Sequence, residues 1–155
     1  MKRNKNLIEL SRDHHHGLLL GWKIKQGLKR NVPFDELADY IIHFSREALF
    51  PHFKEEENQV LVYVNPDDPF CKRTLFEHAQ LRGIVARISI KGLTDDKLLL
   101  TLAEKLDAHI RFEERELFPY IEKLLSIQQL DDMGKLISEL HHPYTETYAN
   151  EFWAG

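Results

Sequence analysis

Apolar residues recur at every third or fourth position through five long segments of this chain. That spacing is typical of one face of an α-helix, and no segment shows the two-residue alternation of a half-buried strand. Short clusters of turn-forming residues separate the helical patterns: "NVP" at 31–33, "NPDDP" at 65–69 and "KGLTDD" at 91–96. The sequence therefore predicts an all-α fold.

The periodic segments predict five helices, over residues 6–30, 34–64, 71–90, 95–125 and 131–152. Pro51 is expected to kink the second, Thr94 to cap the fourth, and Asp131 or Asp132 to cap the fifth. Long helices with short connections pack antiparallel. We therefore expect an up-down-up-down four-helix bundle over about residues 6–125, with an additional C-terminal helix.

Length and charge narrow the class of protein. The 155 residues suit a single domain, residues 1–155, which can bury roughly two-thirds of the unfolded chain's surface. The net charge is −4, and the 21 lysines and arginines are spread among acidic neighbours, which argues against nucleic acid or an anionic membrane as partner. No apolar run suits a membrane span or a signal peptide, so we expect a cytoplasmic location.

Two ionisable residues interrupt the apolar stripe of the helix expected over 95–125. His109 and Glu113 lie on the same face as Leu106 and Leu117. A buried, unpaired carboxylate costs several kcal/mol, so it must be hydrogen-bonded, neutralised or bound to a cation. The four-residue step places the two side chains on one face, about 6 Å apart along the helix axis, a separation that a metal ion can bridge.

The same frame occurs earlier in the chain. In "HFKEEE", residues 52–57, His52 and Glu56 repeat the four-residue step on an apolar face. Each frame also follows a helix in which an acidic residue precedes histidine, in "DHHH" at 13–16 and in "EHAQL" at 77–81. The chain thus has the pattern of a duplicated unit.

The two preceding helices each place a histidine on the inward face. His78 lies on the apolar stripe of the helix expected over 71–90. In the first helix His14 shares a face with the apolar residues, but His15 also has Leu18 three residues on, so either can be the inward one. We expect His16 to face solvent.

Four imidazoles and two carboxylates are a chemically coherent set of metal ligands. Carboxylates can bridge two ions roughly 3.5–4 Å apart. Imidazole and carboxylate suit iron, manganese or zinc, and open positions on such ions leave room for a small ligand. Cys71 is the only cysteine, which argues against a structural zinc site or an iron–sulfur cluster.

These motifs, together with "HIRFEERELFP" at 109–119, resemble those of the hemerythrin-like, or HHE cation-binding, family over about residues 6–125. The resemblance implies a four-helix bundle that holds two iron ions in a non-haem di-iron centre, although zinc or manganese also suits the residues. The ligands that it implies are His14 or His15, His52, Glu56, His78, His109 and Glu113, with both glutamates bridging.

The sequence departs from oxygen-carrying hemerythrins at two positions. Those proteins have a second histidine four residues after the helix-three ligand, where this chain has Arg82. They also use a carboxylate five residues after the helix-four histidine, which would be Glu114; we prefer Glu113 because it stays on the apolar stripe. The reduced set is more similar to bacterial di-iron proteins associated with repair of iron–sulfur centres. We expect Arg82 to reach the surface or to pair with a nearby carboxylate, such as a bridging glutamate.

The function expected from this resemblance is reaction with, or sensing of, O2, NO or peroxide in iron, oxidative or nitrosative stress. A di-iron oxidase or peroxidase, and a metal-responsive regulatory module, are the alternatives. The expected partners are a small diatomic or peroxide ligand and either a second copy of the chain or another protein. Outside the ligand set we expect Glu57 and Glu116 to be solvated, His43 to be a surface or packing residue, and His141 and His142 to lie away from the site.

Overall fold

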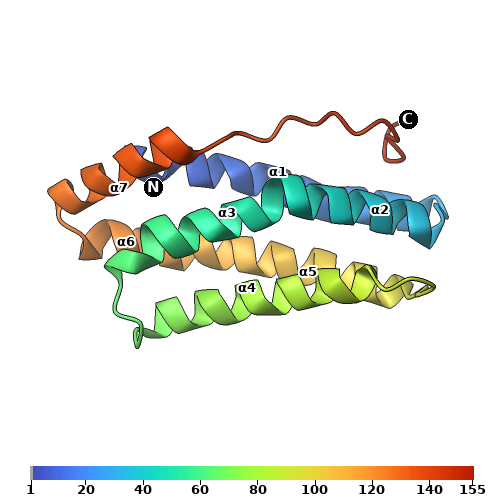
Figure 1. The fold of residues 1–155 in the computed structure, drawn as a ribbon, viewed down its shortest axis with the longest axis horizontal. Coiled ribbons are helices and arrows are strands. Elements are labelled where there is room, and N and C mark those ends of the chain that lie inside the picture. Colours follow the sequence, from blue (N-terminus) through green and yellow to red (C-terminus); the bar gives the residue numbers. More distant parts are fainter. Residues whose placement is uncertain (1) are drawn as a thin grey trace.

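Four helical rods run antiparallel in the computed structural model, which describes residues 2–155 (Figure 1). No strand occurs within that range. The rods are α1 (Ile8–Lys29), α2 with α3 (Phe34–Phe44 and Phe50–Glu55), α4 (Pro69–Ile88), and α5 with α6 (Asp96–Phe112 and Phe118–Leu124). The expected all-α, up-down-up-down bundle is confirmed, and a further helix, α7 (Ile127–Leu140), follows it.

Aspartate side chains begin the third and fourth rods. The carboxylate of Asp68 accepts a hydrogen bond from the backbone N–H of Phe70, so α4 begins two residues before the expected start. At α5 the cap is Asp95, whose side chain accepts from the backbone N–H of Leu98. The expected cap at Thr94 is therefore wrong by one residue.

The second and fourth rods contain wide, π-helical turns. These turns are Ser45–Leu49, Glu56–Val60 and Glu113–Leu117, and a 3₁₀ turn, Leu61–Tyr63, ends the second rod. Pro51, expected to kink its helix, lies in the first turn of α3 directly after a π-helical turn. Two of the wide turns begin at the glutamates that the sequence places on the inward faces, and such turns are frequent at functional sites.

The last helix begins earlier than expected. Its N-cap is Ser126, whose hydroxyl accepts from the backbone N–H of Gln129, while the Gln129 side chain accepts from the backbone N–H of Ser126. This reciprocal pair satisfies two backbone donors that a helix start otherwise leaves unpaired. Asp131 and Asp132, the expected caps, lie inside α7 instead.

The same helix also ends earlier than expected. α7 stops at Leu140, because Pro143 has no backbone N–H and disfavours helical backbone in the residue before it. Beyond it, the chain runs without regular helix along α1 toward the turn between α1 and α2 (Figure 1). The expected helix over 131–152 is thus wrong for its C-terminal part.

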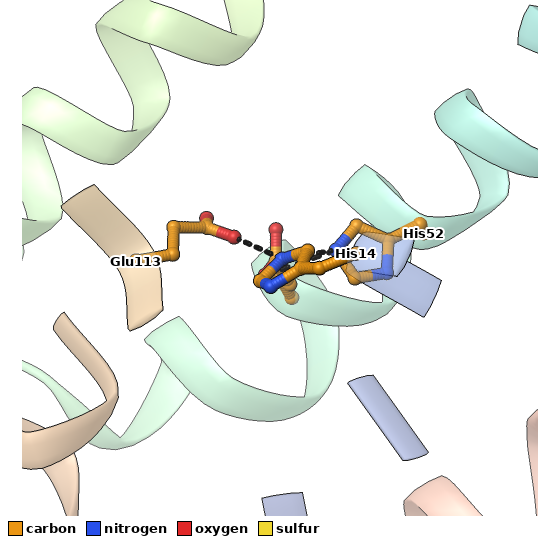
Figure 2. A group of neighbouring side chains, drawn as sticks. His14, His52 and Glu113 are labelled. Carbon is orange, nitrogen blue, oxygen red and sulfur yellow. Dashed lines mark hydrogen bonds and ion pairs between the residues drawn. The ribbon is translucent and has the colours of Figure 1, made fainter. Parts of the chain in front are cut away.

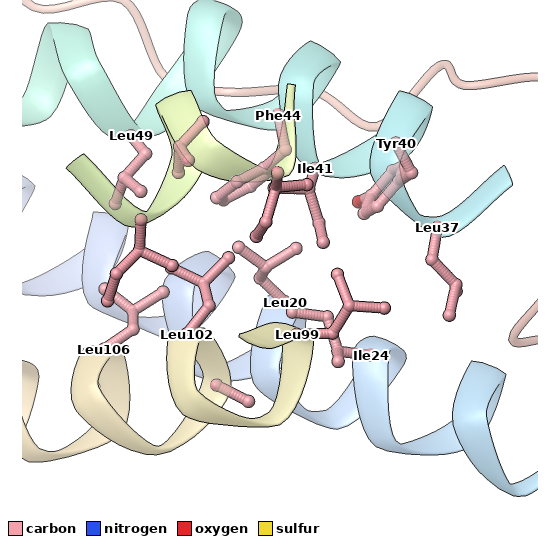
Figure 3. Packing of buried hydrophobic residues seen from close by; sticks show 14 of the residues in the cluster. Leu20, Ile24, Leu37, Tyr40, Ile41, Phe44, Leu49, Leu99, Leu102 and Leu106 are labelled. Atoms are coloured by element: carbon pink, nitrogen blue, oxygen red, sulfur yellow. The ribbon is translucent and has the colours of Figure 1, made fainter. Parts of the chain in front are cut away.

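Two apolar clusters fill the bundle. One lies toward the α1–α2 turn and includes Leu20, Ile41, Leu99 and Leu102 (Figure 3). The other, which includes Leu10, Val60, Phe112, Leu117 and Met133, lies at the end covered by α7. On each rod a short polar stretch separates the two clusters, and this stretch positions the candidate site. For residues 2–155, no helix has the length and apolar character that crossing a membrane requires.

Candidate metal centre

Six side chains that the sequence singles out converge between the two apolar clusters. All are buried, and both glutamates are fully inaccessible to solvent. We call them the central cluster: His14, His52, Glu56, His78, His109 and Glu113. Of the two candidates in α1, His14 is the inward residue, and His15 is exposed and lies outside this cluster.

The first group of this cluster comprises His14, His52, Glu56 and Glu113. Nε2 of His14 lies 2.9 Å from Oε1 of Glu113 and 3.2 Å from Nε2 of His52. Figure 2 shows these three side chains with their contacts as dashed lines. Nε2 of His52 is 3.2 Å from Oε2 of Glu56. Two ring nitrogens and two carboxylates thus face one point.

The second group comprises His78, His109, Glu56 and Glu113. Nε2 of His78 lies 3.1 Å from Oε1 of Glu56, and Nε2 of His109 lies 3.1 Å from Oε2 of Glu113. Each glutamate therefore turns one oxygen to the first group and the other oxygen to the second. This is the arrangement in which a carboxylate can bridge two cations.

Several atoms of the central cluster lack a hydrogen-bond partner anywhere in residues 2–155. They are both carboxylate oxygens of Glu56, Oε2 of Glu113, Nε2 of His78 and Nε2 of His109. Some of them lie only 3.1 Å apart and still form no hydrogen bond with one another. Buried polar atoms are otherwise almost always paired. The donor set therefore fits two cations between these atoms.

Each histidine of the cluster also faces a carboxylate on its outer side. The four outer carboxylates are Asp13, Glu57, Glu77 and Glu114. Their distances to the Nδ1 atoms are 2.8 Å for Asp13–His52, 2.7 Å for Glu57–His78, 2.7 Å for Glu77–His109 and 2.9 Å for Glu114–His14. When Nδ1 donates to such a carboxylate, Nε2 presents its lone pair to the centre, and the ring orientation is fixed.

A small cavity adjoins the cluster on the side of the first group. Its volume is about 30 Å³, enough for roughly one or two water-sized molecules. The lining includes three histidines of the cluster, His14, His52 and His109, and the apolar side chains of Phe53 and Ile110. A small ligand could thus reach the centre from a partly apolar space.

The model of the hemerythrin HHE cation-binding domain matches residues 6–121, a span that contains the whole central cluster and the four outer carboxylates. The chain belongs to this family. Comparisons with curated proteins and with solved structures give no match.

Within this hemerythrin-family site, sequence reasoning missed three of the outer carboxylates, Asp13, Glu57 and Glu77. The fourth, Glu114, was the alternative to Glu113, but it lies outside the central cluster and contacts Nδ1 of His14. Glu57, expected to be solvated, is partly buried and contacts His78, so that expectation is wrong; Glu116 is exposed as expected. A signal was available, because every outer carboxylate directly precedes or follows a residue of the central cluster in the chain.

Arg82 pairs with a nearby carboxylate, as expected, but this carboxylate is Glu57 and not one of the two central glutamates. Its guanidinium donates two hydrogen bonds to Glu57, at 2.9 and 3.1 Å. Since Glu57 also contacts Nδ1 of His78, the arginine fixes the carboxylate that orients that imidazole. Paired guanidinium–carboxylate bonds of this kind are strong and geometrically specific.

The charges within the cluster shift its pKa values strongly. Burial alone would lower the pKa of His14, but its hydrogen bonds with Glu113 and Glu114 raise it well above the ordinary value. Burial would raise the pKa of Glu113, but the charge of His109 and hydrogen bonds from neighbours lower it well below the usual range. In the metal-free protein these shifts favour a charged imidazole at His14 beside a charged carboxylate at Glu113.

The remaining histidines contact the C-terminal segment or its neighbours. His16, expected to face solvent, is partly buried against Tyr144, with ring centroids 5.4 Å apart. His43 packs against Tyr148 at 4.9 Å. His141 was expected to lie away from the site, but it contacts the outer carboxylate Asp13, whereas its neighbour His142 is exposed.

Proposed function

We propose that this chain binds two iron ions in a non-haem di-iron centre that reacts with or senses O2, NO or peroxide. The observation that carries the proposal is the pair of four-residue groups that share Glu56 and Glu113. Membership of a cation-binding family supports it. So does the set of buried nitrogen and oxygen atoms without hydrogen-bond partners, because a cation at each group would satisfy them.

In this proposal His14 and His52 would hold one ion and His78 and His109 the other, with Glu56 and Glu113 available to both. Bound iron would supply redox chemistry and open coordination positions for a small ligand. The chain itself contributes orientation: the outer carboxylates hold the four rings, and the two apolar clusters keep bulk water away. The cavity beside the first group gives a small molecule its place.

The presence of Arg82 favours a redox reaction of the iron with the small ligand over reversible binding of oxygen. Each group offers two imidazoles. Oxygen carriers have a further histidine at the position of Arg82, and in this chain Arg82 is hydrogen-bonded to Glu57. A guanidinium cannot ligate a metal because it has no free lone pair. We therefore expect the reduced, iron-loaded protein to be oxidised irreversibly in air within one or two cycles.

The test is metal analysis of the anaerobically loaded protein, with optical spectra before and after exposure to oxygen, nitric oxide and peroxide. We expect two irons per chain and spectral changes that do not reverse when the gas is removed. A zinc-loaded sample is the control, since zinc has no redox chemistry. One ion or none per chain would contradict the di-iron proposal, and a ferrous spectrum regained over many oxygen cycles would restore the carrier function.

A matched pair of variants tests the contribution of α1. His14→Ala should lose one of the two ions, because Nε2 of His14 belongs to the first group alone. His15→Ala should retain both, because the adjacent side chain is exposed and lies outside the cluster. Metal-to-protein ratios after gel filtration give the answer, and equal ratios in the two variants would contradict the assignment of His14.

A further inference from the structure

The C-terminal segment reaches the candidate centre through one side chain. His141 follows α7 directly and lies outside the part of the chain that the family model matches. Its side chain is only 5% exposed. Nδ1 lies 2.7 Å from Oε2 of Glu55, and Nε2 lies 3.2 Å from Oδ1 of Asp13. Both ring nitrogens are therefore occupied by carboxylates.

Asp13 links this histidine to the central cluster. Its Oδ2 atom is 2.8 Å from Nδ1 of His52, while its Oδ1 atom faces His141. The Asp13 carboxylate is thus held from two sides, and a continuous chain of polar contacts runs from His52 through Asp13 and His141 to Glu55. His141 itself contacts no residue of the central cluster in this network.

The other three outer carboxylates are held from within the bundle. Arg82 donates to Glu57, Arg73 donates to Glu77 at 2.8 Å, and Ser11 donates to Glu114 at 2.8 Å. All of these supporting residues lie on α1 or α4. Asp13 differs because its support comes from the segment beyond the bundle. The first group therefore depends on a part of the chain that the second group does not need.

Contacts on both sides fix the position of His141. Its backbone N–H donates to the carbonyl of Ile137 in the last turn of α7, at 2.8 Å. Further along, Tyr144 packs edge-on against Phe44 at 5.2 Å. Near the end of the chain, the ammonium of Lys23 lies 4.0 Å from the ring centroid of the buried Trp153. The segment is thus attached before and after the histidine.

We propose that His141 is a positioning residue for the metal centre, holding Asp13 so that His52 keeps the orientation that the first group requires. The inference rests on the proposed function. Without His141, the partly exposed Asp13 carboxylate can turn toward water, and Nδ1 of His52 loses its fixed acceptor. Loss of a group that orients a metal ligand typically weakens metal binding by about 10–100-fold. His141 acts one contact further out, so we expect about a tenfold effect, confined to one of two ions.

The same three side chains could instead hold an ion of their own, since ligand atoms of Asp13, Glu55 and His141 lie within 4.8 Å of one another. Unlike the central cluster, this group contains no buried atom without a partner among those of residues 2–155. A cation would have to replace contacts that are already made. The positioning role is therefore the one that the contacts favour, and a third ion becomes an outcome of the test.

The test is a cobalt(II) titration of the full-length metal-free protein, followed by absorption spectra and metal analysis. We compare the wild type with His141→Ala, Asp13→Asn and the double variant. His142→Ala is the matched control, because His142 is adjacent and exposed. We expect two ions in every case, one of them bound about tenfold more weakly, with an altered spectrum, in His141→Ala. The double variant should bind this ion no more weakly than Asp13→Asn does, because His141 acts through Asp13.

Each other outcome contradicts a specific statement. Equal affinities and spectra in His141→Ala and the wild type would overturn the positioning role and leave the di-iron proposal intact. Additive losses in the double variant would show that His141 does not act through Asp13, also overturning it. Three ions in the wild type, with one lost in His141→Ala, would make His141 a ligand instead. Fewer than two ions in the wild type would overturn both proposals.

Discussion

Glu113→Gln is expected to abolish tight binding of both metal ions. The two oxygens of Glu113 face different groups: Oε1 lies 2.9 Å from His14 and Oε2 lies 3.1 Å from His109. A glutamine has the same shape but no charge, and only one of its terminal atoms can accept a metal. Each group would therefore lose a ligand or a bridging charge at once. The decrease in metal affinity should exceed the roughly 10–100-fold decrease that is typical when a residue that only orients a ligand is replaced.

Glu116→Gln is the matched control for this variant. The residue lies in the same π-helical turn, carries the same charge and is exposed, so both ions should stay bound. Metal-to-protein ratios at equal free metal concentration make the comparison, and circular dichroism verifies that both variants are folded. If Glu113→Gln held one ion as tightly as the wild type does, the carboxylate would serve one group alone.

The rods of the bundle could be predicted because each carries a long apolar stripe with a clear turn signal at its end. The residues at which these helices begin were harder to predict. At α5, for example, Thr94 and Asp95 are both good capping residues, and only the backbone geometry selects Asp95. The end of α7 was missed for a different reason. The segment beyond Leu140 keeps several aromatic residues, which resemble a helical stripe in sequence but pack individually against α1 and α2.

The convergence of the six central side chains could be anticipated because ionisable residues on an apolar stripe need a partner. The choice between His14 and His15 could not, because Gly17 brings α1 close to Ile110 of α5 and so sets the rotation of the helix. Asp13, Glu57 and Glu77 escaped prediction because they lie on the edges of the stripes, where a solvated residue is the usual outcome. The contact of His141 with Asp13 could not be predicted from the sequence pattern, because a segment without helical periodicity gives no signal of where it packs on the bundle.

Metal-free protein is expected to lose stability as the pH rises above neutral. Burial lowers the pKa of His52, but the charge of Glu56 and the hydrogen bond with Asp13 outweigh it and raise the pKa to about 9. Burial also lowers the pKa of His78, and the nearby carboxylates of Glu113, Glu56 and Glu57 raise it to about 11. In the absence of metal, bound protons therefore supply the positive charge that the two buried carboxylates need.

The direction of this change in stability follows from comparison with the unfolded chain, in which both histidines titrate near pH 6.5. Because the folded pKa values are higher, the stabilising contribution is complete below pH 6.5 and is lost as the pH rises through about 9 for His52 and about 11 for His78. For His52 alone, the loss by the end of its window is on the order of 3 kcal/mol.

Iron-loaded protein should behave differently over the same range, because binding requires neutral imidazoles and releases these protons, so metal affinity rises with pH. Both profiles of the free energy of unfolding against pH can be measured by urea unfolding, followed by circular dichroism. One sample is kept metal-free with chelator, and the other is loaded with iron under anaerobic conditions. The free energy of unfolding should fall between pH 6.5 and about 9 without metal, and the difference between the two samples should widen. A metal-free profile that stays level or rises would show that protons do not balance Glu56 and Glu113, and the histidines would then have to be neutral in the folded, metal-free chain.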